Sequence, residues 1–370
     1  MVTSDKASMR ILYLTAQSFH PQARKASTHF LALGLRQLGH EVYVLTVGTS
    51  LLRLAMAPHR HKGVWAYRNW RQDADGLWKR VLMDAVHRPA RDTGFVSRLF
   101  WRSGKLGKSV LRPIGPIDAV VIASGLAVSY YDFVRRTYPE ARVLYNAADS
   151  LSGVGYSGPL LEAERKVLAT ADAVRTPSAL LARQFPAGTS WFLIPHGVDK
   201  TVLLKDTPSP YPPGSINAVL AGSTLLDWNA LLAIARAVPE ATIHVFGVGD
   251  RPGGAANLAM HGEVGFDQLA PYIQHASCAL APYQLTAKNA YIAESSLKIR
   301  QYRVCGLPIV CPNTLEIEGD DVFQYDPANL SSVSRSIRAA LRRGKRPFSK
   351  HLPTWNEVAI EMDGILAGRC

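Results

Sequence analysis

The chain has 370 residues, of which 47% are apolar and 19% charged, and its net charge at pH 7 is +13. This length exceeds what one hydrophobic core usually supports, so two domains are expected, and the composition excludes an intrinsically disordered chain. The polar N-terminus predicts no signal peptide, and no uncharged apolar stretch reaches the roughly 18 residues that a membrane-spanning helix needs. The four cysteines form neither a Cys-x-x-Cys pair nor a metal-ligand spacing, which favours a reduced cytoplasmic setting without a structural metal.

In the first half of the chain, short β-branched segments alternate with helical patterns, which is typical of parallel sheets covered by helices on both faces. Helices are predicted at residues 28–38 and 127–137, and a further helix, strand and helix lead to a strand that ends at 191–195. Buried strands are predicted at residues 10–15, 41–47, 119–123 and 142–146.

Residues 53–112 are less regular and strongly basic. They carry 14 Lys or Arg against 4 Asp, which is +10 of the total +13, together with Trp65, Trp70, Trp78 and Trp101. Lysine and arginine near anionic lipid contribute about 1 kcal/mol each, and tryptophan prefers the headgroup layer. This combination favours an anionic membrane surface as a partner. The alternatives are a solvated basic face over an ordinary core and a nucleic-acid surface, for which no recognition motif is present.

The middle of the chain contains a proline-rich stretch. Residues 205–215 contain four prolines and a glycine, which neither a helix nor a central strand tolerates, so the domain boundary is placed there. The predicted domains are residues 1–204 and 215–352, and a final helix at 355–366, within 353–370, is expected to pack back on the first domain. The second domain repeats the alternation, with strands at 217–221, 242–247, near 258 and at 278–282, and helices at 228–238 and 266–276.

This pattern predicts an α/β protein of two doubly wound, Rossmann-like domains facing a cleft, where ligands bind at the carboxyl ends of the strands. The clearest ligand signal lies in residues 278–313. A helix opening with Glu294, Ser295 and Ser296 presents backbone N–H groups that suit a diphosphate, and Lys298 adds a cation for phosphates or a sugar carboxylate. An ordinary helix cap with a solvated lysine is the alternative.

Glycine-containing turns follow two strands of the second domain. Gly222, Ser223 and Thr224 come directly after the strand at 217–221, and residues 246–249 read Phe-Gly-Val-Gly at the end of the next one. Glycine permits close approach of a ligand to the backbone. Glu263 follows the short third strand, where its carboxylate suits the two hydroxyls of a ribose, or else it caps the next helix.

In the first domain, Asp149 follows the strand at 142–146 and is a candidate general base, because a partly desolvated carboxylate there accepts a proton from a sugar hydroxyl. Capping of the next segment is the alternative. His196 is a weaker candidate for the same role. The loop of residues 16–27, with His20, Arg24 and Lys25, is expected to contact an anionic or sugar acceptor. His29 and His196 are predicted to contact it as well.

Several motifs occur in order: YNAADSLSGV, PHGVD, AGSTLLD, HGE followed by ALAPY, and ESSLKIRQY before GLPIVCPN. Together they resemble the membrane-associated glucuronosyltransferases of xanthan- and acetan-type polysaccharide assembly, over most of the chain up to about Asn313. The resemblance implies the GT-B fold and an inverting, metal-independent enzyme without a cofactor. Its expected reaction transfers glucuronate from UDP-glucuronate to a mannose that ends a polyprenyl-diphosphate-linked trisaccharide, at the cytoplasmic face of the inner membrane.

The resemblance also assigns residues. Asp149 matches the family's catalytic aspartate, in a motif that reads Ala-Ala-Asp-Ser where the family has Ala-Ser-Asp-Gly. Thr224 and Val264 stand where the family has two methionines that wall the uridine. The predicted donor site comprises Gly222, Ser223, Thr224, Glu263, Val264, Tyr283, Ser295, Ser296, Leu297, Lys298 and Gln301.

In the resulting hypothesis Asp149 deprotonates the acceptor, and Lys298 with the serine-capped helix end stabilises the leaving UDP. Asp73-Ala74-Asp75 is interpreted as a surface turn, so no metal is predicted. Two alternatives remain. One is a GT-B transferase that uses UDP-glucose or GDP-mannose, and the other is a non-catalytic nucleotide-sugar-binding protein at a membrane.

Overall fold

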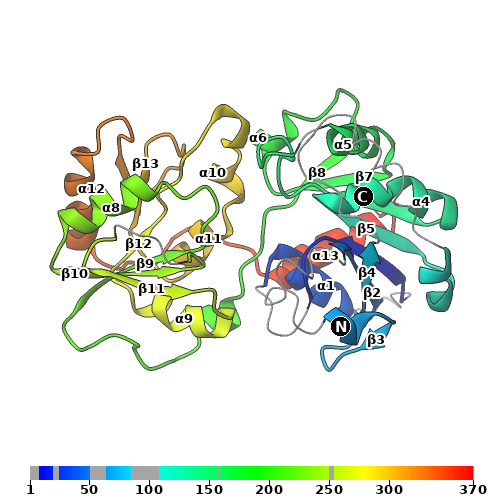
Figure 1. The fold of residues 1–370 in the computed structure, drawn as a ribbon, viewed down its shortest axis with the longest axis horizontal. Coiled ribbons are helices and arrows are strands. Elements are labelled where there is room, and N and C mark those ends of the chain that lie inside the picture. The colour runs from blue at the N-terminus through cyan, green and yellow to red at the C-terminus, as the bar shows by residue number, and fades with distance from the viewer. Residues whose placement is uncertain are drawn as a thin grey trace. The chain divides into compact units, whose positions relative to one another are not determined.

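The computed structural model describes residues 8–19, 25–50, 64–84, 108–156, 158–249 and 254–369. Contacts within the chain divide it into two compact units, of which the first comprises Met1–Pro195 with Trp355–Cys370 and the second His196–Thr354 (Figure 1). The proline-rich stretch at 205–214, where the sequence places the boundary, therefore belongs to the second unit, and the chain passes between units at Pro195 and again at Thr354.

The first unit is built on an eight-stranded sheet in the order β3-β4-β2-β1-β5-β6-β7-β8, in which every neighbouring pair is parallel except β3–β4. The strands are β1 (Arg10–Thr15), β2 (Glu41–Ser50), β3 (Arg71–Gln72), β4 (Trp78–Asp84), β5 (Ala119–Ala123), β6 (Arg142–Asn146), β7 (Ala173–Thr176) and β8 (Trp191–Leu193).

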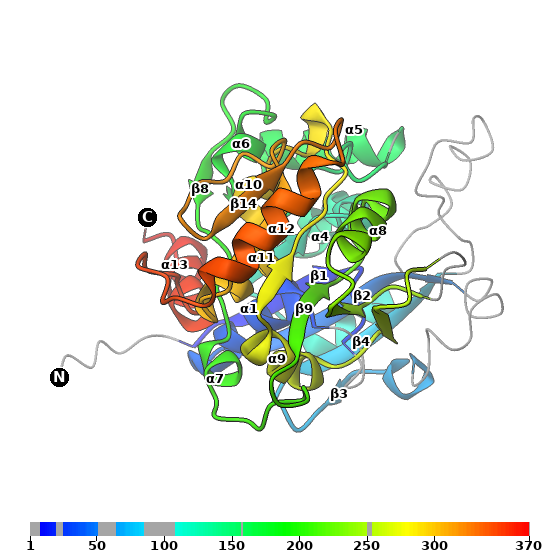
Figure 2. The ribbon, with the colours of Figure 1, turned by 90° about the vertical axis from the view of Figure 1, so that its left-hand side faces the viewer.

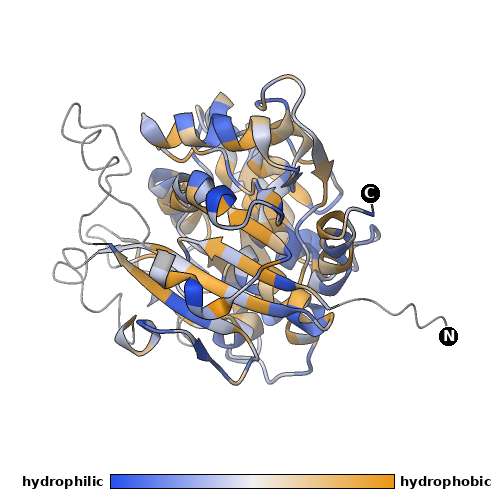
Figure 3. Ribbon diagram, turned by 90° about the vertical axis from the view of Figure 1, so that its right-hand side faces the viewer, coloured by the Kyte–Doolittle hydropathy of each residue, from blue (hydrophilic) through white to orange (hydrophobic). Residues whose placement is uncertain are grey.

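Helices cover both faces of this sheet, which is why its central strands are almost continuously apolar. Leu12 and Leu14 of β1 belong to a core cluster with η5, α4 and α5, so the alternating Ile11 and Tyr13 point to the opposite face. Figure 3 shows the inner strands mostly in orange and the helices with both orange and blue sides. The helical segments are α1 (Ser27–Gln37), η2 (Val64–Tyr67), η3 (Lys108–Val110), η4 (Arg112–Ile114), η5 (Leu126–Tyr130), α4 (Tyr131–Thr137), α5 (Pro159–Thr170), α6 (Ala179–Ala182) and α13 (Trp355–Leu366).

The last helix, α13, packs closely against α1. The rings of Phe30 and Trp355 stack with centroids 5.1 Å apart, and His40 Nε2 lies 2.8 Å from Asp363 Oδ1 in a fully buried pair. Gly34 faces Ala359 so closely that a Cβ atom on Gly34 would lie 2.6 Å from the Ala359 Cβ. The C-terminal segment is thus part of the core of the first unit.

The second unit contains a fully parallel six-stranded sheet in the order β11-β10-β9-β12-β13-β14. Helices α8 and α12 pack together on one face, and α7 packs against both α9 and α11 (Figures 1 and 2). The strands are β9 (Ile216–Ala221), β10 (Ala241–Phe246), β11 (Leu258–Gly262), β12 (Cys278–Leu280), β13 (Ile309–Pro312) and β14 (Val322–Tyr325). The helical segments are α7 (Lys200–Leu203), α8 (Trp228–Ala237), α9 (Phe266–His275), η6 (Ala287–Asn289), α10 (Ile292–Ser295), α11 (Leu297–Val304) and α12 (Ser332–Arg343).

Each sheet contains the doubly wound strand order, in which the direction of winding reverses at one point. The reversal lies between β1 and β5 in the first unit and between β9 and β12 in the second. The two doubly wound sheets that the sequence predicts are therefore confirmed. The sequence did not predict β3, β4, β14 or α12.

The basic segment is more ordered where it is described than the sequence indicates. Trp70 and Trp78 are half-buried against the core of the first unit, and Lys79 is buried. Trp65 is 60% exposed. Trp101 and many of the basic residues, from Arg53 to Lys62 and from Arg88 to Lys105, lie outside the described residues. Within the described part of the chain, no helix is long and apolar enough to cross a membrane.

The contact between α1 and α13 predicts a specific steric effect. Substitution Gly34→Ala places a Cβ against Ala359, and overpacking of this kind lowers the free energy of unfolding by about 1–3 kcal/mol. The double variant Gly34→Ala with Ala359→Gly removes the opposing Cβ and is expected to recover part of the loss. Urea unfolding of the four proteins in the double-mutant cycle measures the coupling, and a coupling of zero would contradict direct contact at this position.

Candidate active site

Two glycine turns lie against each other at the carboxyl edge of the second sheet. Gly222 follows β9 and Gly247 follows β10, and both have positive φ, 86° and 73°. A Cβ on Gly247 would lie 3.2 Å from the Gly222 Cα, so only glycine lets these turns approach. Ser223 and Thr224 follow Gly222 and are exposed. The sequence correctly placed both turns at strand ends.

Two backbone hydrogen bonds join the segment after Gly222 to the loop after β12. Gln284 N donates to Leu225 O at 2.7 Å, and Asp227 N donates to Pro282 O at 2.8 Å. Leu225 has a φ of 51°, an uncommon conformation for a residue with a branched side chain. Strain of this kind persists only where surrounding bonds hold it, and it concentrates at ligand sites.

Tyr283, Ser296 and Lys298 form one cluster beside the Gly222 turn. The Tyr283 and Ser296 hydroxyls are hydrogen-bonded at 2.7 Å. The Lys298 ammonium lies 4.5 Å from the centre of the Tyr283 ring and donates to Gly222 O at 3.4 Å. Tyr283, Ser296 and Lys298, which the sequence assigned to the donor site, are thus brought together beside the backbone of Gly222, another predicted donor residue.

The helix in this cluster begins later than the sequence predicts. Glu294 and Ser295 belong to the one-turn helix α10, whereas α11 begins at Leu297 with Ser296 as its N-cap. The Ser296 hydroxyl accepts from Ile299 N at 3.4 Å. The prediction of a helix opening at Glu294 is wrong because Ser296 has extended backbone and interrupts the helical path.

The other predicted donor residues lie at or near the same edge. Glu263 and Val264 directly follow β11, and Glu263 is exposed while Val264 is half-buried. Gln301 lies one turn beyond Leu297 on α11 and is 9% exposed. Because β12, β9, β10 and β11 are adjacent and parallel, the residues that follow them form a row along one edge.

Tyr302 supports this row, and the sequence analysis missed it. Its side chain is completely buried, and its hydroxyl accepts from Ala221 N at 2.9 Å and donates to Leu280 O at 3.3 Å. It therefore joins the last residues of β9 and β12 at the point where the strand order reverses. A buried tyrosine hydroxyl needs such partners, but a single tyrosine in a helix gives no signal of them in the sequence.

Asp149 lies three residues after the end of β6. Ala147 and Ala148 before it are buried, whereas the Asp149 side chain is exposed. The first unit by itself therefore leaves this carboxylate in contact with solvent, and its partial desolvation stays a prediction. Ser150 fixes the following turn, because its hydroxyl donates to Gln184 Oε1 at 2.9 Å and accepts from Gly153 N.

A buried arginine lies beneath the Asp149 segment. Arg175 of β7 has no exposed surface, and its guanidinium donates to Asn146 Oδ1 and to Pro195 O, both at 3.0 Å. The Asn146 amide in turn donates to the Tyr13 hydroxyl at 3.3 Å. Arg175 thus ties the end of β6 to the residue at which the chain leaves the first unit.

Tyr145, the residue before Asn146, is hydrogen-bonded to Glu164, whose pKa is the most strongly shifted among the carboxylic acids of this region. The Tyr145 hydroxyl donates to Glu164 Oε1 at 2.7 Å. Burial raises the pKa of Glu164 to about 7, against the opposing effect of this hydrogen bond. The pKa of Tyr145 is raised well above its usual value by burial first, then by Glu164 and Asp149.

The predicted acceptor residues are spread over two units. Lys25 is exposed, next to the start of α1, while His29 is buried on that helix and His196 is buried as the first residue of the second unit. Both ring nitrogens of His29 are used, since Nδ1 accepts from Ala26 N and Nε2 bonds Ser18 O at 2.7 Å. Burial lowers the pKa of His29, which keeps the ring neutral. His20 and Arg24 lie outside the described residues.

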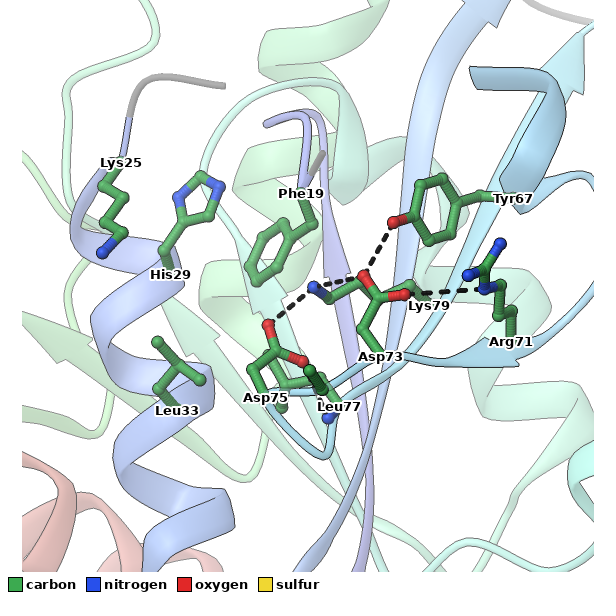
Figure 4. Close-up of a pocket in the computed structure, with 11 residues that line it drawn as sticks. Phe19, Lys25, His29, Leu33, Tyr67, Arg71, Asp73, Asp75, Leu77 and Lys79 are labelled. Carbon is green, nitrogen blue, oxygen red and sulfur yellow. Dashed lines mark hydrogen bonds and ion pairs between the residues drawn. The ribbon is translucent and has the colours of Figure 1, made fainter. Parts of the chain in front are cut away.

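Lys25 and His29 line a cavity of about 440 Å³ in the first unit, shown in Figure 4. Its opposite wall contains Asp73 and Asp75, and their carboxylates hold the buried Lys79 ammonium at 2.9 and 2.6 Å. The sequence interprets this Asp-x-Asp as a surface turn. It is a surface turn, with Ala74 and Asp75 exposed, and both of its carboxylates also pair with the buried Lys79. Among the described residues, no group of three His, Cys, Asp or Glu is arranged to hold a metal ion.

Comparison of the sequence with known proteins places the chain in a family. Residues 13–177 match the family model "Glucuronosyltransferase GumK, N-terminal domain". The UDP-glucuronate:glycolipid 2-beta-glucuronosyltransferase of Xanthomonas campestris pv. campestris is 32% identical over 365 residues, which covers 94% of this chain and 87% of that protein.

Solved structures agree on the architecture. A sucrose-phosphate synthase from Thermosynechococcus elongatus superposes with a TM-score of 0.72 at 13% identity, covering 98% of this chain and 99% of that one. The catalytic domain of starch synthase IV from Arabidopsis thaliana, bound to ADP and acarbose, gives 0.59 at 11% identity, with 98% and 99% covered. At such identities these structures show the fold alone, and that fold is GT-B.

The raised pKa of Glu164 predicts a pH-dependent stability. Between the ordinary pKa of 4.5 and about 7 the folded protein keeps a proton that the unfolded chain loses, so the free energy of unfolding falls as pH rises through this window. The full loss is about 3 kcal/mol. Substitution Glu164→Gln removes the titration and keeps an acceptor for Tyr145, so the variant should gain stability over the wild type from pH 4.5 to 8.

Urea unfolding at several pH values measures this difference. Glu162 is exposed on the same helix, so Glu162→Gln is the control and should follow the wild type. Parallel curves for the wild type and Glu164→Gln would show that Glu164 titrates normally.

Proposed function

Since the chain belongs to the GumK family of glucuronosyltransferases, we propose that it transfers glucuronate from UDP-glucuronate to a terminal mannose of a polyprenyl-diphosphate-linked oligosaccharide. The transfer proceeds by direct displacement with inversion, without a metal ion or cofactor, in exopolysaccharide synthesis. The single observation that carries the proposal is the cluster of Tyr283, Ser296 and Lys298 around the Gly222 turn, in a GT-B chain.

The carboxyl edge of the second sheet suits the donor. The exposed Ser223 and Thr224 that follow the Gly222 turn suit a diphosphate, and the first turn of α11 adds the positive end of a helix. The Lys298 ammonium beside Gly222 adds a positive charge there, which suits the leaving diphosphate or the glucuronate carboxylate. Glu263 accepts hydroxyl donors of the ribose, and Val264 and Thr224 contact the uracil side of the nucleotide.

Asp149 acts as the general base. Its carboxylate takes the proton from the attacking sugar hydroxyl, which adds to the anomeric carbon on the face opposite the departing UDP. Arg175 and the Tyr145–Glu164 pair hold the strand end that carries this segment. Binding of the donor and acceptor excludes water from the exposed carboxylate, which supplies the desolvation that the first unit lacks.

Metal independence is part of the proposal. The leaving diphosphate is stabilised by Lys298 and by the backbone and hydroxyl donors around Ser296, which occupy the place of a Lewis acid. The carboxylates of the Asp-x-Asp motif, Asp73 and Asp75, are both paired with Lys79.

The lipid carrier of the acceptor favours a location at the cytoplasmic face of the inner membrane. The exposed Trp65 and the net charge of +10 in residues 53–112 suit peripheral contact with anionic lipid. A transferase for UDP-glucose or GDP-mannose is the competing function, and the similarity to a UDP-glucuronate transferase favours glucuronate.

Substitution Asp149→Asn tests the base. The variant keeps its shape but cannot accept the proton, so kcat should fall at least about 100-fold while KM for UDP-glucuronate stays nearly constant. Asp132→Asn, which removes a surface ion pair with Lys166, is the control and should retain activity. Steady-state kinetics with a lipid-diphosphate trisaccharide as acceptor measure kcat and KM for each variant. Near-normal turnover by Asp149→Asn would remove Asp149 from the mechanism.

A donor screen tests the substrate. In EDTA, the protein should transfer from UDP-glucuronate and not from UDP-glucose or GDP-mannose. Lys298→Met should lower kcat/KM for UDP-glucuronate by about 100-fold, by analogy with the loss of one preorganised charge donor, whereas the exposed Lys205→Met should not. Transfer from a neutral donor alone, or dependence on a divalent metal, would overturn the corresponding part of the proposal.

A further inference from the structure

The cavity in the first unit is lined by aromatic, aliphatic and charged side chains that belong neither to the donor site nor to the catalytic base. We infer that it is a subsite for a neutral sugar ring of the acceptor, and that Phe19, Leu33 and Asp75 select that ring. The inference rests on the proposed function, because it assigns a place to the glycan of the glycolipid. The cavity, of about 440 Å³, is within the size range of small-molecule pockets.

One wall of the cavity is apolar and rigid. Phe19 stacks on His29 with ring centroids 4.0 Å apart and an interplanar angle of 19°. Leu33 continues this wall along α1, and Leu77 adds to it from the turn before β4. Because both nitrogens of His29 are bonded, its ring is fixed and braces Phe19. A flat ring with aliphatic neighbours suits the C–H face of a pyranose.

The facing wall is polar, as Figure 4 shows. The Asp73 carboxylate accepts from the Tyr67 hydroxyl at 2.7 Å and from Lys79. Asp75 accepts from Lys79 and from Leu77 N at 3.1 Å. A carboxylate has about four lone-pair sites and an ammonium three N–H groups, so these described contacts leave acceptors and a donor for sugar hydroxyls.

The charge of this wall favours a neutral ligand. Burial raises the pKa of Asp73, but the Tyr67 hydroxyl and Lys79 outweigh it and the net pKa is lowered, so the carboxylate is ionised. Asp73 and Asp75 are balanced by Lys79 and by Arg71, whose Nε lies 3.7 Å from Asp73. The lining of the whole cavity holds these two carboxylates and three cations, Lys25 included, and a sugar presents hydroxyls that both signs of charge can bond.

One side of the cavity, formed by Phe19 and Lys25, lies at the edge of the sheet that also carries Asp149, and the other side is formed by β3, β4 and the turn between them. Phe19 and Lys25 belong to the segment that follows β1, one of the two strands between which the strand order of this sheet reverses. Asp149 follows β6 at the same edge of the same sheet.

Substitution Leu33→Trp tests the subsite by filling it from the helix side. Leu33 is half-buried, and Gln37→Trp adds the same bulk to an exposed position one turn further along α1. For Leu33→Trp, KM for the glycolipid and Kd for the free trisaccharide should each rise at least about tenfold, since pockets discriminate single methylenes by about 10–200-fold. Gln37→Trp should match the wild type in both.

Phe19→Leu is the second variant, because it removes the ring while keeping an apolar side chain in the fold. It should weaken binding of the free trisaccharide severalfold, with UDP-glucuronate affinity unchanged. Titration calorimetry with the trisaccharide and with UDP-glucuronate separates the two sites, and thermal unfolding verifies that each variant is folded.

The outcomes distinguish this inference from the proposed function. Trisaccharide binding that is lost in Leu33→Trp supports the subsite even if UDP-glucuronate proves to be the wrong donor. Wild-type trisaccharide affinity in folded Leu33→Trp and Phe19→Leu overturns the subsite even if glucuronate transfer is confirmed. Loss of binding to vesicles containing anionic phospholipid, with trisaccharide binding retained, would also overturn it and assign the cavity to lipid.

Discussion

Parallel pairing is the constraint on which the candidate site depends. In a parallel sheet every strand ends at the same edge, so segments far apart in the sequence follow one another along that edge. In the second unit this brings the turns after β9, β10, β11 and β12 into one row. In the first unit it places the segments after β1 and β6, with Phe19 and Asp149, at one edge. No local interaction in the sequence would have gathered these residues.

Each unit uses one buried polar side chain to join strand ends, in the second unit at the reversal of strand order, where separating strands leave backbone groups unpaired, and in the first unit away from the reversal. Tyr302 joins Ala221 N of β9 to Leu280 O of β12, beyond the last paired residues of these strands. Arg175 joins Asn146 at the end of β6 to Pro195. Unsatisfied buried groups cost about 1–3 kcal/mol each. Both side chains therefore fix the loops above them while stabilising the sheet.

The apolar strands and the strand-end turns could be predicted because hydrophobic periodicity and glycine are local signals. Strand β4 could not, because it reads as a basic stretch and its buried Lys79 is neutralised by Asp73 and Asp75, whose role depends on tertiary contacts. Arg175 reads as an ordinary charged residue, although it is completely buried. The start of α11 was misplaced by three residues because its cap and the preceding turn have nearly the same composition.

The Asp73–Asp75 pair shows why a short acidic motif has no fixed chemistry of its own. A desolvated ammonium is costly unless it is paired, so the burial of Lys79 requires both carboxylates. Once that ammonium is between them, the wall can no longer attract a cation strongly, yet the described contacts leave lone pairs on both carboxylates and one N–H group on Lys79. The ion pairs that stabilise β4 therefore also determine the class of ligand, and a neutral polyhydroxylated ring satisfies this wall without adding an uncompensated charge.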